Sequence, residues 1–274
     1  FSRQRPDGVF NLVESVGGQG RFIHLAPAVL DALSTPYTGS PTSAVFLTSH
    51  KLETKKRLRS AGLPTPPWHS TDDASADTPV SGVPFIIKSV WEHASIGLGD
   101  DSIIVPADAG ELQVELEKRK EQLGGEAFAE RYIDGREFNL SLLERKEGVS
   151  VLPPAEILFR DFPADKPRIV GYRAKWDEGA HEYHNTPRSF DFPAGDRELL
   201  ERLKTLSRSC WDLFGLRGYA RVDFRVDRKG VPWILEINTN PCLTPDSGFV
   251  AAAAESGLDY TDLIAEIVAG AFRR

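Results

Sequence analysis

The stretch ARVDFRVDRKGVPWILEINTNPCL, residues 220–243, has the pattern of two β-strands joined by a tight turn. Asp-Arg-Lys-Gly at 227–230 is turn chemistry, so the runs on either side are predicted to pair as an antiparallel hairpin. Strand side chains alternate between two faces, so polar residues two apart share a face. The hairpin is therefore expected to bring together four polar side chains: Arg221, Asp223, Glu236 and Asn238.

Three of these residues have the chemistry of a magnesium site. Magnesium prefers carboxylate and amide oxygens, and it usually keeps water and substrate phosphates in its shell. Asp223, Glu236 and Asn238 are therefore predicted to hold Mg²⁺, or Mn²⁺ in its place, beside nucleotide phosphates. Each polar pair alone is common on the solvated face of an antiparallel strand. Their combination favours a site, because Asn-Thr-Asn-Pro at 238–241 ends an apolar strand in a polar loop.

The composition indicates a soluble enzyme rather than a nucleic-acid-binding or membrane protein. The chain has 274 residues, 41% of them hydrophobic, which is enough to bury the core of one to three subdomains. The formal net charge of −7 argues against a nucleic-acid partner, and we attribute most of the basic run from Lys51 to Arg59 to a solvated helix face. No apolar run is long enough to span a bilayer. The two cysteines lack metal-site spacing, so we expect reduced thiols and a cytoplasmic location.

Hydrophobic periodicity and turn residues predict strands and helices along the whole chain. A strand is expected at 7–13 and helices at 22–33 and 42–61, the second stopped by Gly62 and Pro64. Residues 70–82 are expected to form a loop, followed by strands at 84–90 and 102–105 and a helix at 108–123. Several strands, a lid-like loop at 176–196, a helix ending at Phe214, the hairpin and one terminal helix complete the expected order.

Five segments in a fixed order resemble the ATP-grasp superfamily, and within it the D-alanine:D-alanine ligase-like branch. They are PYTGS at 36–40, the Lys51 helix leading into AGLPTPPW at 61–68, FIIKSVWEHASIG at 85–97, ERYIDGREF at 130–138 and the hairpin. The resemblance implies an α+β fold in which two ATP-grasp subdomains grip ATP, preceded by a partial α/β pre-ATP-grasp domain. These parts are expected at residues 1–50 (pre-ATP-grasp), 51–125 (central subdomain) and 126–274 (C-terminal subdomain). The family's first strands and helices have no counterpart in this sequence, so we expect a further N-terminal segment in the natural protein.

The resemblance also assigns residues to the nucleotide. Lys51 and Lys88 are expected to contact the phosphates, and a lysine within the apolar run FIIKSV would otherwise be an uncompensated charge. The turn at 91–99 is the expected phosphate cover, where Gly97 admits backbone N–H groups and Ser95 adds a hydroxyl, although glycines in a turn are also structurally ordinary. The implied adenine hinge is Glu130, Arg131, Tyr132 and Ile133. Glu137 matches the ribose-binding carboxylate. Without the resemblance, the sequence would favour an ordinary charged residue on the exposed face of a strand at this position.

The resemblance implies the chemistry of a carboxylate–amine ligase. ATP phosphorylates a carboxylate to an acyl phosphate, an amine attacks, and an amide or peptide bond forms as phosphate leaves. Arg221 is expected to stabilise the oxyanion of the tetrahedral intermediate, and Lys175 to reach the terminal phosphate from a mobile lid. Ser247 matches a residue that binds the carboxylate of the amine substrate, although a serine before glycine is commonly a turn residue.

Departures from the family's pattern leave the substrates open. Ala94 precedes Ser95 where D-alanine:D-alanine ligases carry two serines, and Trp176 follows Lys175 where they carry tyrosine. Cys242 replaces a glycine, and Glu14-Ser15 replaces a His-Gly pair. We therefore expect a small carboxylate and an amine as substrates, without committing to D-alanine.

Two further functions and several details are left open by the sequence. One alternative is a non-catalytic ATP-binding module, and the other is a phosphotransferase that stops at the phosphorylated substrate. Neither a nucleic acid nor a membrane is expected as a partner, and a homodimer is left open. His181 and His184 lie in the lid-like loop without the spacing of a metal site, and their role is also left open.

Overall fold

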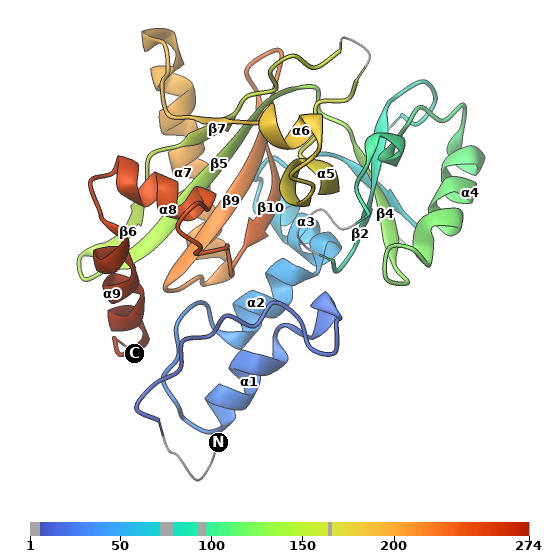
Figure 1. Cartoon of the computed structure of the whole chain (residues 1–274). Coiled ribbons are helices and arrows are strands. Elements are labelled where there is room, and N and C mark those ends of the chain that lie inside the picture. The colour runs from blue at the N-terminus through green and yellow to red at the C-terminus, as the bar shows by residue number, and fades with distance from the viewer. Residues whose placement is uncertain (1–5, 72–78, 93–96, 164–165, 274) are drawn as a thin grey trace.

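The computed structural model describes residues 6–71, 79–92, 97–163 and 166–273. Two antiparallel sheets form its framework, the larger at the centre of Figure 1 and the smaller beside helix α4. This mixture of helices with antiparallel sheets confirms the predicted α+β class. The N-terminal helices lie below the larger sheet in the same view.

The larger sheet has the strand order β10-β9-β5-β7-β8, and β6 pairs with β5. Its strands are β5 (Gly135–Arg145), β6 (Gly148–Val151), β7 (Ala155–Ile157), β8 (Arg188–Ser189), β9 (Tyr219–Asp227) and β10 (Pro232–Asn238). Alternation along β9 separates the two faces: Ala220, Val222, Phe224 and Val226 are buried and belong to the core formed with helix α7 (Arg197–Phe214). The other face of β9 carries the polar side chains.

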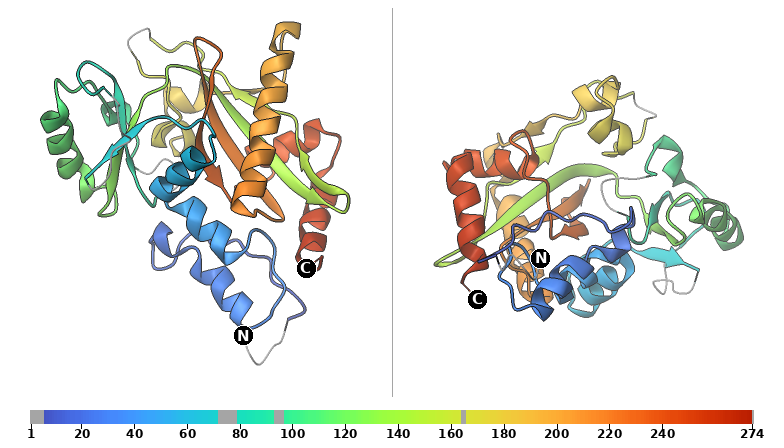
Figure 2. Two further views of the ribbon diagram at one scale, coloured as in Figure 1. Left: turned by 180° about the vertical axis from the view of Figure 1, so that it is seen from behind. Right: turned by 60° about the horizontal axis from the view of Figure 1, so that its bottom comes forward.

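Helices α8 (Gly248–Glu255) and α9 (Tyr260–Ala271) pack at one end of the same sheet. Figure 2 shows α7 and α8 on opposite faces of the sheet. Tyr219 and Phe249 meet edge to face in the core beneath α8. The predicted single terminal helix is therefore wrong, because two helices separated by Gly257 follow the hairpin.

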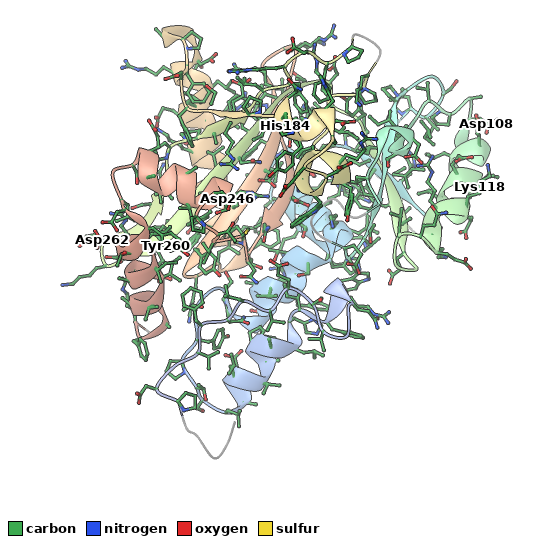
Figure 3. All side chains as sticks on the ribbon, in the orientation of Figure 1. Asp108, Lys118, His184, Asp246, Tyr260 and Asp262 are labelled. Carbon is green, nitrogen blue, oxygen red and sulfur yellow. The ribbon has the colours of Figure 1, made fainter. Side chains whose placement is uncertain are left out.

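The smaller sheet has the order β1-β4-β2-β3. Its strands are β1 (Trp68–Ser70), β2 (Phe85–Ser89), β3 (Ile103–Ile104) and β4 (Ala127–Arg131). Helix α4 (Ala109–Lys120) covers one face, where Leu112 and Leu116 pack against Phe85 and Ile87. Asp108 begins this helix by accepting a hydrogen bond from the Glu111 N–H at 2.9 Å, and Figure 3 shows it with Lys118 at the outer edge of the protein. Because β4 belongs to this sheet, we propose that the smaller subdomain extends beyond residue 125, to about Arg131.

The N-terminal part contains a 3₁₀ turn (Gly20–Phe22) and helices α1 (Leu25–Ala32), α2 (Thr42–Ser49) and α3 (Lys51–Ser60). The helix predicted at 42–61 is interrupted at His50, whose ψ of 96° is extended and whose Nδ1 accepts a hydrogen bond from the Glu53 N–H at 3.2 Å. The strand predicted at 7–13 is wrong, because Val9 makes only an isolated bridge with Tyr37. A chain that pairs at one residue lacks the ladder that defines a strand.

The segment before α7 carries α5 (Tyr172–Trp176) and α6 (His181–His184), which lie between the larger sheet and β2 in Figure 1. It also contains β8 and a 3₁₀ turn (Ala194–Asp196), so the loop predicted at 176–196 has more regular structure than expected. The Tyr172 N–H donates to the Leu98 carbonyl at 2.9 Å, which ties α5 to the smaller subdomain. No helix within the described ranges is long and apolar enough to cross a membrane.

Candidate active site

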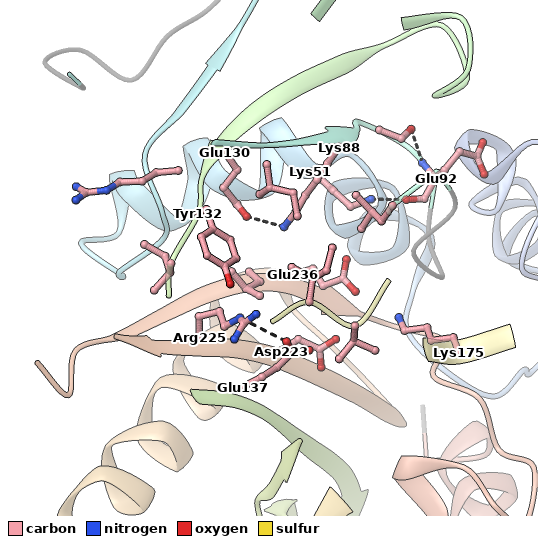
Figure 4. Close-up of a pocket in the computed structure, with 18 residues that line it drawn as sticks. Lys51, Lys88, Glu92, Glu130, Tyr132, Glu137, Lys175, Asp223, Arg225 and Glu236 are labelled. Atoms are coloured by element: carbon pink, nitrogen blue, oxygen red, sulfur yellow. Dashed lines mark hydrogen bonds and ion pairs between the residues drawn. The ribbon is translucent and has the colours of Figure 1, made fainter. Parts of the chain in front are cut away.

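A cavity lies between the two sheets and is lined by side chains from both of them, and small-molecule sites commonly form in such clefts. Figure 4 shows lysines of α3 and β2 on one side and the polar face of β9 on the other, with Lys175 at one end. The cavity brings together most of the residues assigned from the sequence: Lys51, Lys88, Glu130, Arg131, Tyr132, Ile133, Glu137, Lys175, Asp223 and Glu236.

The predicted hairpin is confirmed by the pairing of β9 with β10. Glu236 lies opposite Asp223, and Asn238 lies opposite Arg221. The Arg221 guanidinium donates two hydrogen bonds to the Asp223 carboxylate, at 2.7 and 2.8 Å, and Asn139 Nδ2 donates a third at 2.8 Å. Burial lowers the pKa of Arg221, but Asp223 and Glu236 outweigh it and hold the pKa above its ordinary value. Arg221 is therefore a permanent cation beside two carboxylates.

The donor set of the hairpin fits a magnesium ion. Asp223 and Glu236 both line the cavity, and the Asn238 side-chain oxygen accepts from the Asn240 N–H at 2.9 Å. Two carboxylates and an amide leave room for the water and phosphate ligands that magnesium usually keeps. In the described part of the chain, no three His, Cys, Asp or Glu side chains gather as a complete protein-made metal site. Metal bound here would share Asp223 with Arg221.

Glu130, on the cavity wall, lies between two lysines. One carboxylate oxygen is 2.5 Å from Lys55 Nζ, and the other is 2.6 Å from Lys88 Nζ. Burial raises the pKa of Glu130, but the two lysines outweigh it and hold the pKa below its usual range. Burial lowers the pKa of Lys55 to about 8, although Glu130 opposes that change.

The interpretation of the basic run from Lys51 to Arg59 as a solvated face is wrong for its two most buried members. Lys51 is 8% exposed and Lys55 is 1% exposed. Lys51 Nζ donates to the Glu92 carbonyl at 2.5 Å, and burial lowers its pKa, with Glu236 acting in the opposite direction. The sequence concealed this because Glu130, the counter-charge of Lys55, is 75 residues away.

Glu137 faces the cavity from β5, opposite Arg225 in the ladder with β9. Burial raises the pKa of Glu137, and Arg225 acts in the opposite direction. Arg225 was missed at the sequence level, yet the signal was present. It continues the alternation of Arg221 and Asp223 by one more step, and it lines the same cavity.

The hinge residues contribute both backbone and side chains. The N–H groups of Arg131 and Tyr132 donate to the carbonyl groups of Pro67 and Pro84, at 2.9 Å each. These bonds hold the segment in place while Tyr132 and Ile133 line the cavity. Ser95 lies outside the described residues. Gly97 has a φ of 72° and packs against Leu123, while its neighbour Leu98 lines the cavity.

Four of the assigned residues within the described ranges do not line the cavity: Gly97, Arg221, Asn238 and Ser247. Ser247 begins α8, and its hydroxyl accepts from the Val250 N–H at 3.4 Å. His181 Nε2 is 3.2 Å from the Asp161 carbonyl oxygen, and His184 Nε2 is 2.8 Å from that of Glu178, so both bind the backbone of their own segment. Cys242 is exposed, with its sulfur 3.2 Å from the Thr244 hydroxyl.

Comparisons with known proteins show which family the chain resembles. The family model described as the D-ala D-ala ligase C-terminus matches residues 58–269. The chain is 35% identical over 272 residues to a D-alanine–D-alanine ligase of Methylococcus capsulatus, which covers 98% of this chain and 80% of that protein. It is 34% identical over 266 residues to the uncharacterized protein y4sG of Sinorhizobium fredii, over 97% of this chain and 75% of that protein.

A solved structure shares the fold. The crystal structure of D-alanine–D-alanine ligase from Bacillus anthracis complexed with ATP has a TM-score of 0.68 and 27% sequence identity. The match covers 90% of this chain and 74% of that one.

Proposed function

This chain belongs to the D-alanine–D-alanine ligase family of ATP-grasp enzymes, and from that premise we propose how its residues divide the work of an ATP-dependent carboxylate–amine ligase. The observation that carries the proposal is one cavity between the sheets. Into it converge Lys51, Lys88 and Lys175, from three separate elements, and the two carboxylates of the hairpin. Three cations facing two carboxylates match a polyphosphate with its metal ion.

The nucleotide lies between the sheets in this proposal. Lys51 and Lys88 bind its phosphates, and Lys175 reaches the terminal phosphate from α5. The hinge from Glu130 to Ile133 borders the adenine, and Glu137 accepts hydrogen bonds from the ribose hydroxyls. Support comes from the position of each residue on the cavity wall and from the cationic character of its phosphate end.

Asp223, Glu236 and Asn238 would hold magnesium. Bound there, the ion would neutralise phosphate oxygens and align the phosphoryl group for transfer. The ordered pairing of these residues in the hairpin supports the assignment.

Arg221 supplies the charge that the amide-forming step needs. When an amine attacks an acyl phosphate, negative charge develops on the carbonyl oxygen before phosphate leaves. A fixed cation near that oxygen lowers the barrier, because it needs no reorganisation as the charge forms. Three hydrogen bonds fix Asp223, and two of these come from Arg221, so the guanidinium is already oriented before substrate arrives.

The substrates are proposed to be a small carboxylate and an amine, as in the relatives named D-alanine–D-alanine ligase. Ser247, at the start of α8, would bind the carboxylate of the amine substrate. Its hydroxyl and the first N–H groups of a helix are suited to an anion.

An ADP-release screen of paired carboxylates and amines tests the proposal, with the product identified by mass spectrometry. We expect ADP release to require both partners and Mg²⁺, and the product to be an amide without phosphorus. A phosphorylated carboxylate as the final product would instead indicate a phosphotransferase. Nucleotide binding without turnover for any pair would indicate a binding module.

A further inference from the structure

Arg225 is a buried cation on the cavity wall that the roles proposed above do not use. It is 4% exposed, and it follows Arg221 and Asp223 on the same face of β9. Removing a guanidinium from water is costly unless partners replace the water. The partners of the Arg225 guanidinium therefore indicate the role of this residue.

A backbone carbonyl, a carboxylate and two aromatic rings surround the Arg225 guanidinium. Nη1 donates to the Gly135 carbonyl at 2.9 Å, and Nε is 3.4 Å from the Glu137 carboxylate. The guanidinium carbon lies 5.8 Å from the ring centre of Tyr132 and 5.4 Å from that of Phe159. Aromatic faces and a carbonyl acceptor restrict the guanidinium to one orientation.

Gly135 makes this arrangement possible. A Cβ at this position would lie 2.0 Å from the Val226 carbonyl oxygen, so only glycine lets β5 approach β9 this closely. The close approach places the Gly135 carbonyl within reach of Arg225, and Glu137 two residues further along β5. One strand therefore supplies both the acceptor that fixes Arg225 and the carboxylate that Arg225 faces.

Glu137 needs such a partner. Its side chain is 13% exposed, and a buried carboxylate tends towards the neutral form. To accept hydrogen bonds from two ribose hydroxyls, it must be ionised and correctly oriented. Lys88 and Lys175 also act on it from the opposite sheet and from α5, but these two are the residues proposed to bind phosphates.

We propose that Arg225 is the positioning residue for ribose recognition, because it orients Glu137 and supplies its counter-charge within the nucleotide cavity. This inference rests on the proposed function, in which Glu137 binds the ribose. It goes further by making recognition of the sugar depend on a residue of the metal-binding strand. Loss of Arg225 should then weaken the recognition of the ribose hydroxyls selectively. Loss of a lysine that binds the phosphates should weaken the binding of any nucleotide, with or without these hydroxyls.

Calorimetric titration with ADP and with 2′,3′-dideoxy-ADP, at fixed Mg²⁺, separates these effects without knowledge of the substrates. We expect the parent to prefer ADP by about tenfold or more, as for hydrogen bonds to a charged acceptor. Glu137→Gln and Arg225→Met should each reduce this preference to about twofold or less, and the double variant should lose no more. Arg225→Lys should recover part of the preference. Lys51→Ala is the matched control, since Lys51 is a phosphate lysine whose ammonium donates to the Glu92 carbonyl rather than to Glu137, so its loss should weaken the binding of both nucleotides by the same factor.

The outcomes distinguish the role inferred for Arg225 from the proposal that Glu137 binds the ribose. A parent that binds both nucleotides equally would overturn the Glu137 assignment, and the inference with it. A parent preference that Glu137→Gln removes and Arg225→Met leaves intact would overturn the inference alone. Thermal melting shows whether each variant is folded. If Arg225→Met does not fold, Arg225→Lys decides, because a preference equal to that of the parent would contradict the role of Arg225 and a reduced preference would support it.

Discussion

Glu236 lies opposite Asp223 in the β9–β10 ladder because Leu235 is an extra residue in β10. Ile234 pairs with Phe224, and the next paired residue is Glu236 rather than Leu235. Without that bulge, the register would place Glu236 opposite Val222, on the face that packs against α7. The bulge redirects one carboxylate from the core to the cavity, as bulges beside functional sites commonly do.

Glu236→Gln is therefore expected to affect chemistry far more than folding. The substitution keeps the shape of the side chain and removes the charge that a magnesium ion would require. We expect the magnesium-dependent rate to fall by about a hundredfold or more, as for loss of one electrostatic stabiliser, with a melting temperature within about 2 °C of the parent. Glu201→Gln, on the exposed side of α7, is the control and should change neither quantity. An unchanged magnesium dependence would exclude Glu236 as a ligand.

The alternation of residues along β9 was sufficient to predict one face of the site. The same rule should have included Arg225, because it is the next residue in the series after Arg221 and Asp223. The bulge at Leu235 could not be predicted in this way, since a strand pattern shows which residues share a face but not where the ladder gains a residue. The hairpin and its polar residues were predictable, and the register that joins them was not.

The burial of Lys55, which differs from the solvated helix face expected from the sequence, is explained by a long-range ion pair. A run of lysines and arginines on one helix is usually solvated, and Lys56 agrees, because it pairs with Glu53 at the surface. Lys55 differs because β4 brings Glu130 against it, and its ammonium also donates to the Thr65 hydroxyl at 2.8 Å. Helix periodicity gives the face of a residue but not the partner that tertiary packing supplies. The splitting of the helix at His50 was likewise hidden, since no glycine or proline marks it.

Lys55 and Lys88 both contact Glu130, and we expect them to differ in what they support. Lys55→Met should destabilise the protein by about 3 kcal/mol, because it leaves part of a buried carboxylate unpaired. Lys88→Ala should cost less stability and weaken ATP binding more, since Lys88 lines the cavity. Chemical denaturation and nucleotide titration measure the two effects. The double variant Lys55→Met/Glu130→Gln should be more stable than Lys55→Met alone, and a lower stability would contradict the pairing.

His50 should make stability depend on pH. Burial lowers its pKa from 6.5, and its Nδ1 caps α3 by accepting from the Glu53 N–H, which only the neutral ring can do. The contribution is therefore fully present above pH 6.5 and is lost as the pH falls through the lower pKa of the folded state. His50→Asn keeps a cap without ionisation, so its loss of stability below pH 6.5 should be smaller than that of the parent by about 1 kcal/mol. Chemical denaturation at pH 8 and pH 5 measures the loss of unfolding free energy in each protein. Equal losses in the parent and in His50→Asn would contradict this role.

Arg221→Ala should separate nucleotide binding from amide formation. The guanidinium pairs with Asp223 and is proposed to face the oxyanion, so its loss should reduce turnover by about a hundred- to a thousandfold with every substrate pair. Binding of ADP should remain within about threefold, because the phosphate lysines are untouched. Arg228→Ala, at the turn of the same hairpin, is the control and should leave turnover unchanged. Amide synthesis at the parent rate in the Arg221 variant would rule out the proposed role.

D-Alanine alone should be a poor substrate for the unmodified protein. Trp176, 57% exposed at the end of α5, stands next to Lys175 where D-alanine:D-alanine ligases carry a tyrosine, and Ala94 occupies the position of a serine. A pocket built on hydrogen bonds discriminates strongly when a partner is missing, so another carboxylate–amine pair should be ligated at least about a hundredfold more efficiently. Trp176→Tyr combined with Ala94→Ser should raise the rate with D-alanine, whereas Trp176→Phe with Ala94→Ser, which lacks the phenol hydroxyl, should raise it less. Efficient D-alanyl-D-alanine synthesis by the parent, measured as dipeptide formed per ADP released, would refute this expectation and make D-alanine the substrate.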